Sequence, residues 1–451
     1  MEVVIQQSYG YKTILKTALP LLLSLVLEQI IGLTDVAFLG HYGEIELAAA
    51  ALSTVFFLVL LMQGYGYSIG SQALMAQANG RKSMKRIGVY FRQSAIFLVG
   101  VGIFLWGVTQ CIFPWIQAHV IEDPQIGVAV DDYLFWRTVG LPISFLCLLI
   151  RAFYIATLRS KVITVSAIVM VLTNVVFNYL LIFGWGPIPS MGIAGAAIAS
   201  TISEVAALGY FLYKLRQEKD DQKYELTKDF RWDGALQKKL FCLGRWLMLQ
   251  EALSFGAWFF FFVAVEHLGS TSLGVANVVR QAGSVLFLFI HAFGTTCGSL
   301  AANLYGAGHY DAIRPVAWRG MLLSILFVVP LCLLYAFFPQ TIFSIFTNLE
   351  DIKAVAEPTF YVMLIGYVAA IPCYHYYFIL GAIGMTKESS ITSLIATAVY
   401  IAYIFCLPYL SQDVAFYWTT DWVFAFILGC GAYYYWKNVS WKDVQLHSAH
   451  E

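Results

Sequence analysis

The chain has 451 residues, of which 60% are hydrophobic and only 12% are charged, and its formal net charge at pH 7 is zero. Soluble domains are about 25% charged, so a soluble protein of this composition could not cover its surface with polar groups. The charge balance also lacks the basic footprint of a nucleic-acid-binding protein. The eight cysteines lie within apolar runs, which is typical of small hydrophobic residues rather than of disulfides or a metal site.

Apolar stretches such as "ILFVVPLCLLYAFF" and "VFAFILGCGAYYYW" repeat along the chain between short charged breaks. A helix needs about 20 residues to cross the hydrocarbon core, so these runs predict roughly a dozen membrane spans. The first residues lack a basic segment followed by a cleavage site with small residues, so we expect no removable signal peptide. The sequence therefore predicts an all-α, multi-pass membrane protein.

Basic loops alternate with acidic or neutral ones. The loops "NGRKSMKR" (79–86) and "LRSK" (158–161) are basic, whereas "HYGEIE" (41–46), "IEDPQ" (121–125) and "SQD" (411–413) are acidic. Because basic loops face the cytoplasm, we expect both termini on that side, which requires an even number of spans and suggests about 12. A bacterial inner membrane is the expected location.

One long polar stretch, "KLRQEKDDQKYELTKDFRWDGALQKK", lies near the middle of the chain at residues 214–239. Its mixed charges suit a cytoplasmic connector between two halves. We therefore predict an N-lobe of helices 1–6 at residues 1–213, a linker at residues 214–239, and a C-lobe of helices 7–12 at residues 240–451.

The two halves resemble each other in sequence. "HYGEIELAAAA" (41–51) matches "HLGSTSLGVAN" (267–277) at His, Gly, Leu and Ala, and "GSQALMAQANGRKSMKR" (70–86) matches "GSLAANLYGAGHYDAIR" (298–314). With six spans in each half, the repeats are parallel and their axis runs along the membrane normal. Parallel repeats of this kind occur in transporters, whose substrate sites lie near the midplane where the repeats meet.

Six stretches carry a resemblance to a known family: "DVAFLGHYGEIELAAAAL" (35–52), "AQANGRKS" (76–83), "NVVFNYLLIFG" (174–184), "MGIAGAAIAS" (191–200), "QEALSFGAW" (250–258) and "NLYGAGHYDA" (303–312). In their order and spacing they resemble the multidrug and toxic compound extrusion (MATE) family over nearly the whole chain. The resemblance implies two pseudo-symmetric six-helix bundles around a central V-shaped cavity. It also implies export of organic, often cationic, compounds in exchange for Na⁺ or H⁺.

The first predicted span contains the segment "LEQIIGLTDVAFLG", with Glu28 and Asp35 on nearly the same helix face. A carboxylate at the centre of a bilayer costs a few kcal/mol or more, so such acids are usually functional. Glu28 could form a second proton site, line the cavity floor where substrate binds, or pair with a cation. Pro20, in the same helix, removes one backbone hydrogen bond and favours a kink. The resemblance suggests a bend there that responds to the state of the acid.

Asp35 is the predicted cation-coupling residue, and an ion bound there would need oxygen partners. Asn174 and Asn178 are spaced i, i+4 and so share one face of the fifth span, while Ser200 and Thr201 lie in the sixth. Asp35, Asn174 and Asn178 form the possible Na⁺ site. Many relatives in the resembled family carry an acid where Asn178 stands. Alternatively, these polar side chains only hydrogen-bond helices together.

Glu251, in "QEALSFGAWFFFF", is the predicted acid of the C-lobe and matches an acid of helix 7 in many members of the resembled family. It could bind a cationic aromatic substrate by charge and cation–π contact, or serve as a cation-coupling group. A purely structural role would require an internal cation such as Arg245 or Arg280.

The tenth predicted span carries no acid, although some members of the resembled family have one there. Its Tyr374 and His375 are predicted to contact substrate, whereas a lone histidine in an apolar run is more often a satisfied core residue. His291 is a second histidine of the same half. Arg137 and Arg151 flank the fourth span and are expected to extend toward a membrane interface.

These features predict a monomeric secondary active exporter of cationic amphiphilic compounds that works by alternating access. Its partners would be small organic substrates and membrane lipid, and it would use Na⁺ or H⁺ but no organic cofactor. A flippase for lipid-linked precursors is the alternative, but its cavity would need basic residues for pyrophosphate. No His-Glu-x-x-His, Gly-x-Ser-x-Gly or Walker motif suggests an enzyme or an ATP-driven pump. A channel is disfavoured because two non-identical halves with buried acids suit alternating access better.

Overall fold

The computed structural model describes residues 9–120, 123–228, 231–347 and 350–439. Within these ranges the regular structure is helical, apart from one isolated bridge between Trp185 and Ile188. Helices dominate because a segment in lipid must satisfy its backbone N–H and C=O groups internally. The prediction of an all-α membrane protein is confirmed.

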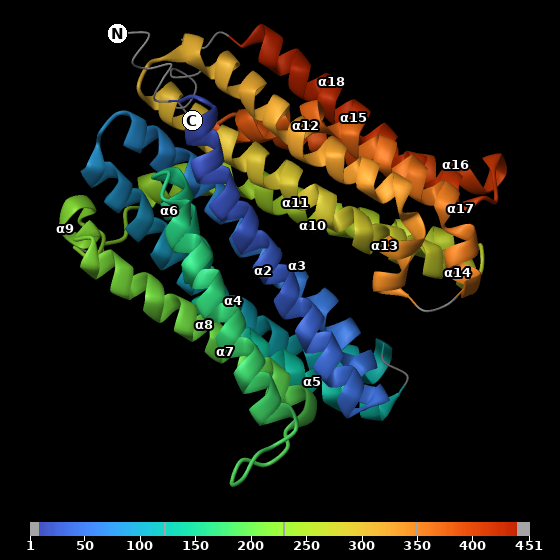
Figure 1. The fold of residues 1–451 in the computed structure, drawn as a ribbon. Helices are drawn as coiled ribbons and strands as arrows, with labels where there is room; N and C mark the ends of the chain where they lie inside the picture. The colour runs from blue at the N-terminus through green and yellow to red at the C-terminus, as the bar shows by residue number, and fades with distance from the viewer. Residues whose placement is uncertain (1–8, 121–122, 229–230, 348–349, 440–451) are drawn as a thin grey trace. The chain divides into compact units, whose positions relative to one another are not determined.

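The helices follow one another along the chain with short connections (Figure 1). The first half contains α2 (Tyr11–Tyr42), α3 (Glu44–Gly80), α4 (Met84–Val120), α5 (Pro124–Val139), α6 (Leu141–Ala156), α7 (Ser160–Ile182), α8 (Gly192–Gln217) and the short α9 (Asp220–Tyr224). The second half contains α10 (Gly234–Glu266), α11 (Ser270–Gly306), η1 (Tyr310–Ala312), α12 (Ile313–Phe337), α13 (Pro339–Phe346), α14 (Glu350–Val355), α15 (Glu357–Ala382), α16 (Thr386–Leu410), α17 (Val414–Tyr417) and α18 (Thr419–Asn438).

In the described part of the chain, 11 helices are long and apolar enough to cross a membrane, and the pair α5–α6 supplies a twelfth crossing if it is one span. The two members of that pair meet at an angle of 49°. The break falls at Gly140, the C-cap of α5, and Pro142 lies in the first turn of α6. Proline has no N–H to continue the ladder of α5, so the helix ends and restarts in a new direction.

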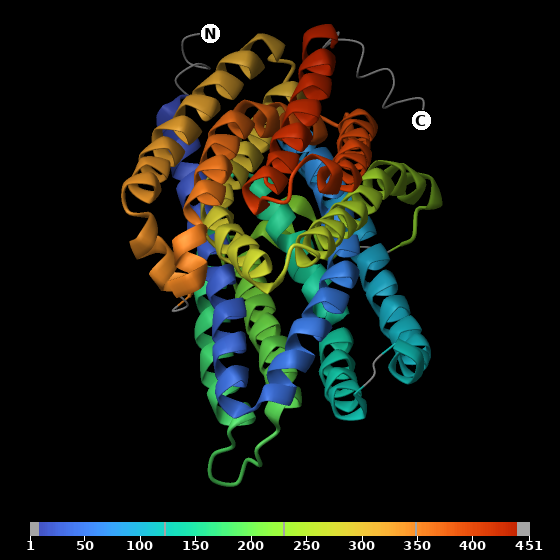
Figure 2. The ribbon, with the colours of Figure 1, turned by 90° about the vertical axis from the view of Figure 1, so that its right-hand side faces the viewer.

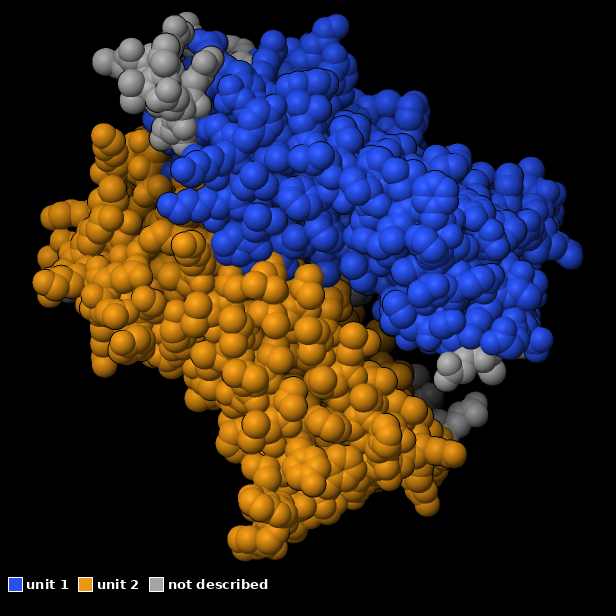
Figure 3. Space-filling view, in the orientation of Figure 1, with its two compact units in different colours: residues 1–22, 249–451 blue, residues 23–248 orange. Residues whose placement is uncertain are grey.

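The chain divides into two compact units (Figure 3). Unit 1 comprises residues 1–22 and 249–451, and unit 2 comprises residues 23–248. The boundary falls inside α2, two residues after Pro20. The short helix α9 of the polar connector belongs to unit 2.

In unit 2, α7 and α8 pack along each other, and the loop that joins them projects beyond the ends of both helices (Figure 2). Gly195 makes this close approach possible, because a Cβ there would lie 2.6 Å from the carbonyl oxygen of Leu181. Small residues at such crossings let two helix backbones come together in a membrane. The same unit packs α3 against α4, α5 and α6.

In unit 1, α15 packs along both α11 and α18. The core of unit 1 is rich in aromatic side chains. Phe261 and Trp418 meet edge to face with ring centroids 5.5 Å apart, and Tyr335 stacks on Phe360 at 5.6 Å. Such pairs add favourable quadrupole contacts to the burial of apolar area.

Equivalent positions in the two halves adopt the same local structure. His41 Nδ1 lies 2.7 Å from the carbonyl oxygen of Ala37, and His267 Nδ1 lies 2.7 Å from that of Val263. The helices that follow, α3 and α11, each have 37 residues. The helices of the two matching sequence segments therefore correspond in length as well as in sequence.

Candidate functional site

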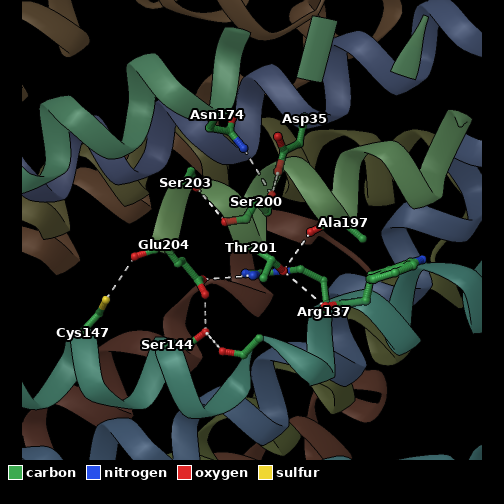
Figure 4. Close-up of polar contacts among 12 residues, drawn as sticks. Asp35, Arg137, Ser144, Cys147, Asn174, Ala197, Ser200, Thr201, Ser203 and Glu204 are labelled. Carbon is green, nitrogen blue, oxygen red and sulfur yellow. Dashed lines mark hydrogen bonds and ion pairs between the residues drawn. The ribbon is translucent and has the colours of Figure 1, made fainter. Parts of the chain in front are cut away.

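The polar side chains predicted from the first half meet in a closed ring of hydrogen bonds in unit 2. Asn178 Nδ2 donates to one carboxylate oxygen of Asp35 and, at 3.0 Å, to Asn174 Oδ1. Asn174 Nδ2 donates to Ser200 Oγ at 3.2 Å, and Ser200 Oγ donates to the other oxygen of Asp35 at 3.3 Å (Figure 4). Three helices, α2, α7 and α8, thus each contribute to one site.

One amide oxygen of the ring accepts no hydrogen bond from the described residues. Asn174 and Asn178 are fully buried, whereas Asp35 is only partly buried. Asn178 Oδ1 accepts no hydrogen bond from the described part of the chain. Buried acceptors are nearly always satisfied, so an unsatisfied amide oxygen beside a carboxylate fits a position that a cation occupies. Thr201 is not in the ring, because its Oγ1 donates to the backbone of Trp136 and Ala197.

Glu204, which lies on α8 one helical turn beyond Ser200, forms an ion pair with α5. Arg137 Nη1 of α5 contacts Glu204 Oε1 at 3.0 Å, and the two side chains are only 11% and 14% exposed. Ser144 of α6 donates to the other oxygen of the same carboxylate. Arg137 and Ser144 lie on opposite sides of the break at Gly140, so the bend between α5 and α6 directs both at Glu204.

A second ion pair joins α2 to α6 within unit 2. Arg151 Nη1 contacts Glu28 Oε1, with side-chain exposures of 17% and 32%. Of the alternatives for Glu28, pairing with a cation is the one seen in the structure. The expectation that Arg137 and Arg151 extend to a membrane interface is wrong for both guanidinium groups. Each is held inside the lobe because pairing with a carboxylate offsets the cost of leaving water.

Glu251, the predicted acid of the second half, lies on α10 in unit 1 and is partly buried. It has no ion pair or hydrogen bond with any residue that the structure describes. Arg280, a candidate counter-ion, lies over the ring of Phe262, 5.3 Å from its centroid. The amide of the neighbouring Gln250 is hydrogen-bonded at both ends, since its nitrogen donates to Tyr377 and its oxygen accepts from Ser390 Oγ at 3.2 Å. Glu251 is therefore a carboxylate without a described counter-ion.

The polar side chains of α15 differ in accessibility. His375 is 0% exposed, and its ring nitrogens lie 3.2 Å from Ser324 Oγ and 3.0 Å from the carbonyl oxygen of Ile371. These contacts match the alternative of a satisfied core histidine. Tyr374 is partly buried and meets Phe287 edge to face at 5.1 Å. His291, on α11, meets Phe378 of α15 edge to face, with ring centroids 5.2 Å apart.

Two membrane-depth acids were missed in the sequence. Glu204 lies in the apolar run of α8, four residues after Ser200, and Asp421 lies in the first turn of α18. Asp421 interacts electrostatically with the phenols of Tyr367 and Tyr374. Both could have been found by the same signal as Asp35, an acid inside a long hydrophobic stretch.

Two sequence-related halves of membrane-spanning helices, with a polar ring buried in one of them, define a membrane transporter of the duplicated-bundle type. The chain belongs to the MatE family, whose model matches residues 20–180 and again residues 247–406. The two matches fall one in each half and cover most of the chain. Members of this family are membrane transporters, and the chain is assigned to that class.

Several curated relatives share this family. The "probable multidrug resistance protein NorM" of Synechocystis is 27% identical over 342 residues, which cover 75% of this chain and 73% of that protein. The protein of the same name from Thermotoga maritima is 25% identical over 366 residues, covering 77% and 74%. That of Rhizobium meliloti is 23% identical over 443 residues, covering 94% and 89%.

Solved transporter structures share the fold. A MOP superfamily transporter from Pyrococcus furiosus, described as having a binding pocket of reversed polarity, superposes with a TM-score of 0.87 at 16% identity and 98% coverage of both chains. An outward-facing MATE family transporter superposes with a TM-score of 0.85 at 16% identity, covering 96% of this chain and 97% of that one. At these identities the likeness establishes the fold alone.

Proposed function

We propose that this multi-pass membrane transporter is a secondary active multidrug exporter. It moves organic, cationic amphiphilic compounds out of the cell in exchange for inward movement of Na⁺ or H⁺. The names of the NorM relatives support a multidrug substrate range. The proposal includes a monomer in a bacterial inner membrane with both termini in the cytoplasm, as the alternation of basic and acidic loops favours.

The ring around Asp35 is the observation that carries the proposal. Asp35 has no ion pair in the described part of the chain, and its oxygens are held by neutral donors from Asn178 and Ser200. A carboxylate without an ion pair at membrane depth is costly unless a mobile cation neutralises it in turn. Asp35, Asn174 and Asn178, with Ser200, supply only oxygen and amide groups, which suit Na⁺ or a proton.

Ion and substrate compete in the proposed cycle. In the outward-facing state a cation binds at Asp35 and lowers the affinity for the exported compound, which leaves. After the lobes change their relative orientation, the cation leaves to the inside and a new substrate binds. The coupling free energy is reciprocal, so substrate must weaken cation binding by the same factor.

Substrate contact is proposed for the acids and aromatic residues named from the sequence. Glu251 is the strongest candidate, because it has no described counter-ion and lies on a helix rich in aromatic residues. Tyr374 and Glu28 are weaker candidates, and His375 would have to leave its buried contacts first. Pro20 is proposed to hinge α2 in response to the state of Asp35, and a Pro20→Ala variant that transports normally would contradict this role.

The flippase alternative would need basic residues that are free to bind pyrophosphate, and two arginines lie in the α5–α6 pair. Both guanidinium groups are paired, Arg137 with Glu204 and Arg151 with Glu28. These two pairs carry no net positive charge for a pyrophosphate group. This charge balance favours a cationic substrate over an anionic one.

The test is ethidium efflux from proteoliposomes under separately imposed Na⁺ and pH gradients. The Asp35→Asn variant should lose gradient-driven efflux in both conditions while it remains folded and inserted. Asp413→Asn is the matched control, because Asp413 caps α17 outside the spans and asparagine caps a helix equally well. Efflux at the unmodified rate in Asp35→Asn would refute the assignment of Asp35.

A further inference from the structure

Asp35 lies close to one cationic side chain that it does not pair with. Arg137 interacts electrostatically with Asp35, and Tyr133 on the preceding turn of α5 interacts with both. Nevertheless, the guanidinium group makes its ion pair with Glu204, at 3.0 Å. Asp35 accepts a hydrogen bond from Ser200 of α8, and Glu204 lies one helical turn further along the same helix, so both acids lie near this one arginine inside unit 2.

Several contacts hold Arg137 on Glu204 rather than on Asp35. Its carboxylate receives Arg137 on one oxygen and Ser144 on the other, and its backbone carbonyl accepts from Cys147 Sγ at 3.5 Å (Figure 4). The guanidinium group also lies 4.0 Å from the ring centroid of Phe57, which favours its position by cation–π attraction. A charge-assisted contact in which both carboxylate oxygens accept a hydrogen bond is an arrangement that stabilises a buried pair.

The arginine nevertheless retains the means to bind a second acid. Arg137 Nε is buried and donates to no acceptor within the described ranges. Arg137 interacts electrostatically with two carboxylates, those of Glu204 and Asp35. If Glu204 were uncharged, Asp35 would remain as its charged partner. With Glu204 charged, the three side chains carry −1, +1 and −1, so the group has a net charge of −1 and one monovalent cation neutralises it.

We propose that Glu204 is a positioning residue that holds Arg137 away from Asp35 and so keeps the Asp35 ring open to the coupling cation. The inference rests on the proposed function, because it assigns a task to Glu204 only if Asp35 binds that cation. Arg137 is then a tethered competitor of the cation. A competitor raises the cation concentration needed for half-saturation without changing the rate at saturation.

The experiment measures ethidium efflux from proteoliposomes while NaCl is titrated at fixed pH, and again while pH is titrated without Na⁺. If Arg137 occupies Asp35 nine-tenths of the time in Glu204→Gln, the half-saturating cation concentration should rise about tenfold. The rate at saturating cation should stay within about threefold of the unmodified protein, since the ring itself is intact. Removing the competitor in Glu204→Gln/Arg137→Gln should return half-saturation to within about threefold of the original value.

A purely structural ion pair would behave differently. Breaking it would lower the amount of folded transporter, and hence the maximal rate, without moving half-saturation. Glu218→Gln is the matched control, because it removes a partner of Arg159 at the end of the same helix α8 but lies outside the ring. If Glu204→Gln does not fold, Arg137→Gln alone decides: half-saturation should be lower, because the variant removes a positive charge that interacts with Asp35.

Three results would overturn the inference: unchanged half-saturation in Glu204→Gln, no recovery in the double variant, or unchanged or increased half-saturation in Arg137→Gln alone. Failure of the proposed function is distinguishable from these results. In that case Asp35→Asn itself retains cation-dependent efflux. If Asp35→Asn loses efflux and Glu204→Gln behaves like the unmodified protein, only the role of Glu204 is rejected.

Discussion

Glu28 of α2 forms an ion pair with Arg151 of α6, whereas Asp35, on nearly the same face of the same helix, forms none in the described part of the chain. The two acids therefore differ in what neutralises them. Glu28 has a fixed counter-ion within its own unit, while Asp35 is held by neutral amide and hydroxyl donors. A fixed ion pair stabilises the lobe, and an open carboxylate can exchange cations.

Glu28→Gln should therefore cost stability before it affects cation coupling. The change leaves the Arg151 guanidinium without its carboxylate at membrane depth, and losing one partner of a buried pair costs about 3 kcal/mol. The melting temperature in detergent should fall by several degrees. Glu28→Gln/Arg151→Leu should recover much of the loss, because it removes the unpaired charge as well. An unchanged melting temperature with weaker ethidium binding would instead support direct substrate contact by Glu28.

The connector that follows α8 should respond to acid. Glu225 receives Lys85 at 3.3 Å and Lys228 at 3.7 Å, while Arg92 donates to its backbone carbonyl. Hydrogen bonding to Lys85, with a smaller contribution from nearby positive charge, holds the pKa of Glu225 below its ordinary value of 4.5. A lowered pKa means that these contacts stabilise the docked connector above pH 4.5 and are lost as pH falls through the lower folded value.

Hydrogen exchange of residues 220–228 at descending pH checks this expectation. The ordinary pKa of Glu225 is 4.5. After correction for intrinsic exchange, protection in the unmodified protein should therefore decrease as the pH falls below that value. Glu225→Gln should show no such step and should have lower protection at neutral pH. High salt should weaken protection in the unmodified protein, because exposed ion pairs are screened. A step that persists in Glu225→Gln would assign it to another group.

The members of the Asp35 ring could be predicted from the sequence because each rule involved is local. Intramembrane acids are rare, and the i, i+4 spacing of Asn174 and Asn178 fixes their common face. Ser200 lies on α8, the helix next to α7 along the chain, and its hydroxyl closes the ring between Asn174 and Asp35.

The pairing of Arg137 with Glu204 could not be predicted in this way. It depends on a 49° bend at Gly140, where a Cβ would lie 3.0 Å from the side chain of Thr201. Such a bend is set by packing between helices that are distant in sequence. The sequence showed only an arginine near the end of an apolar run, which on local grounds is expected to extend toward water.

The close crossing of α7 and α8 is the last feature to test, because it brings the two asparagines to Ser200. Gly195→Ala would place a Cβ 2.6 Å from the carbonyl oxygen of Leu181, and backbone cannot yield as a flexible side chain can. Overpacking of this kind costs about 1–3 kcal/mol. The melting temperature should fall, and the cation concentration for half-maximal ethidium efflux should rise as the ring loosens.

Gly209→Ala on the same helix is the matched control. A Cβ at Gly209 would meet nothing within 4 Å, so this variant gains only helix propensity, about 0.5–1 kcal/mol. The two glycine variants should therefore shift the melting temperature in opposite directions. Equal shifts would show that the approach of α7 to α8 adapts to an added methyl group, and the ring would then not depend on Gly195.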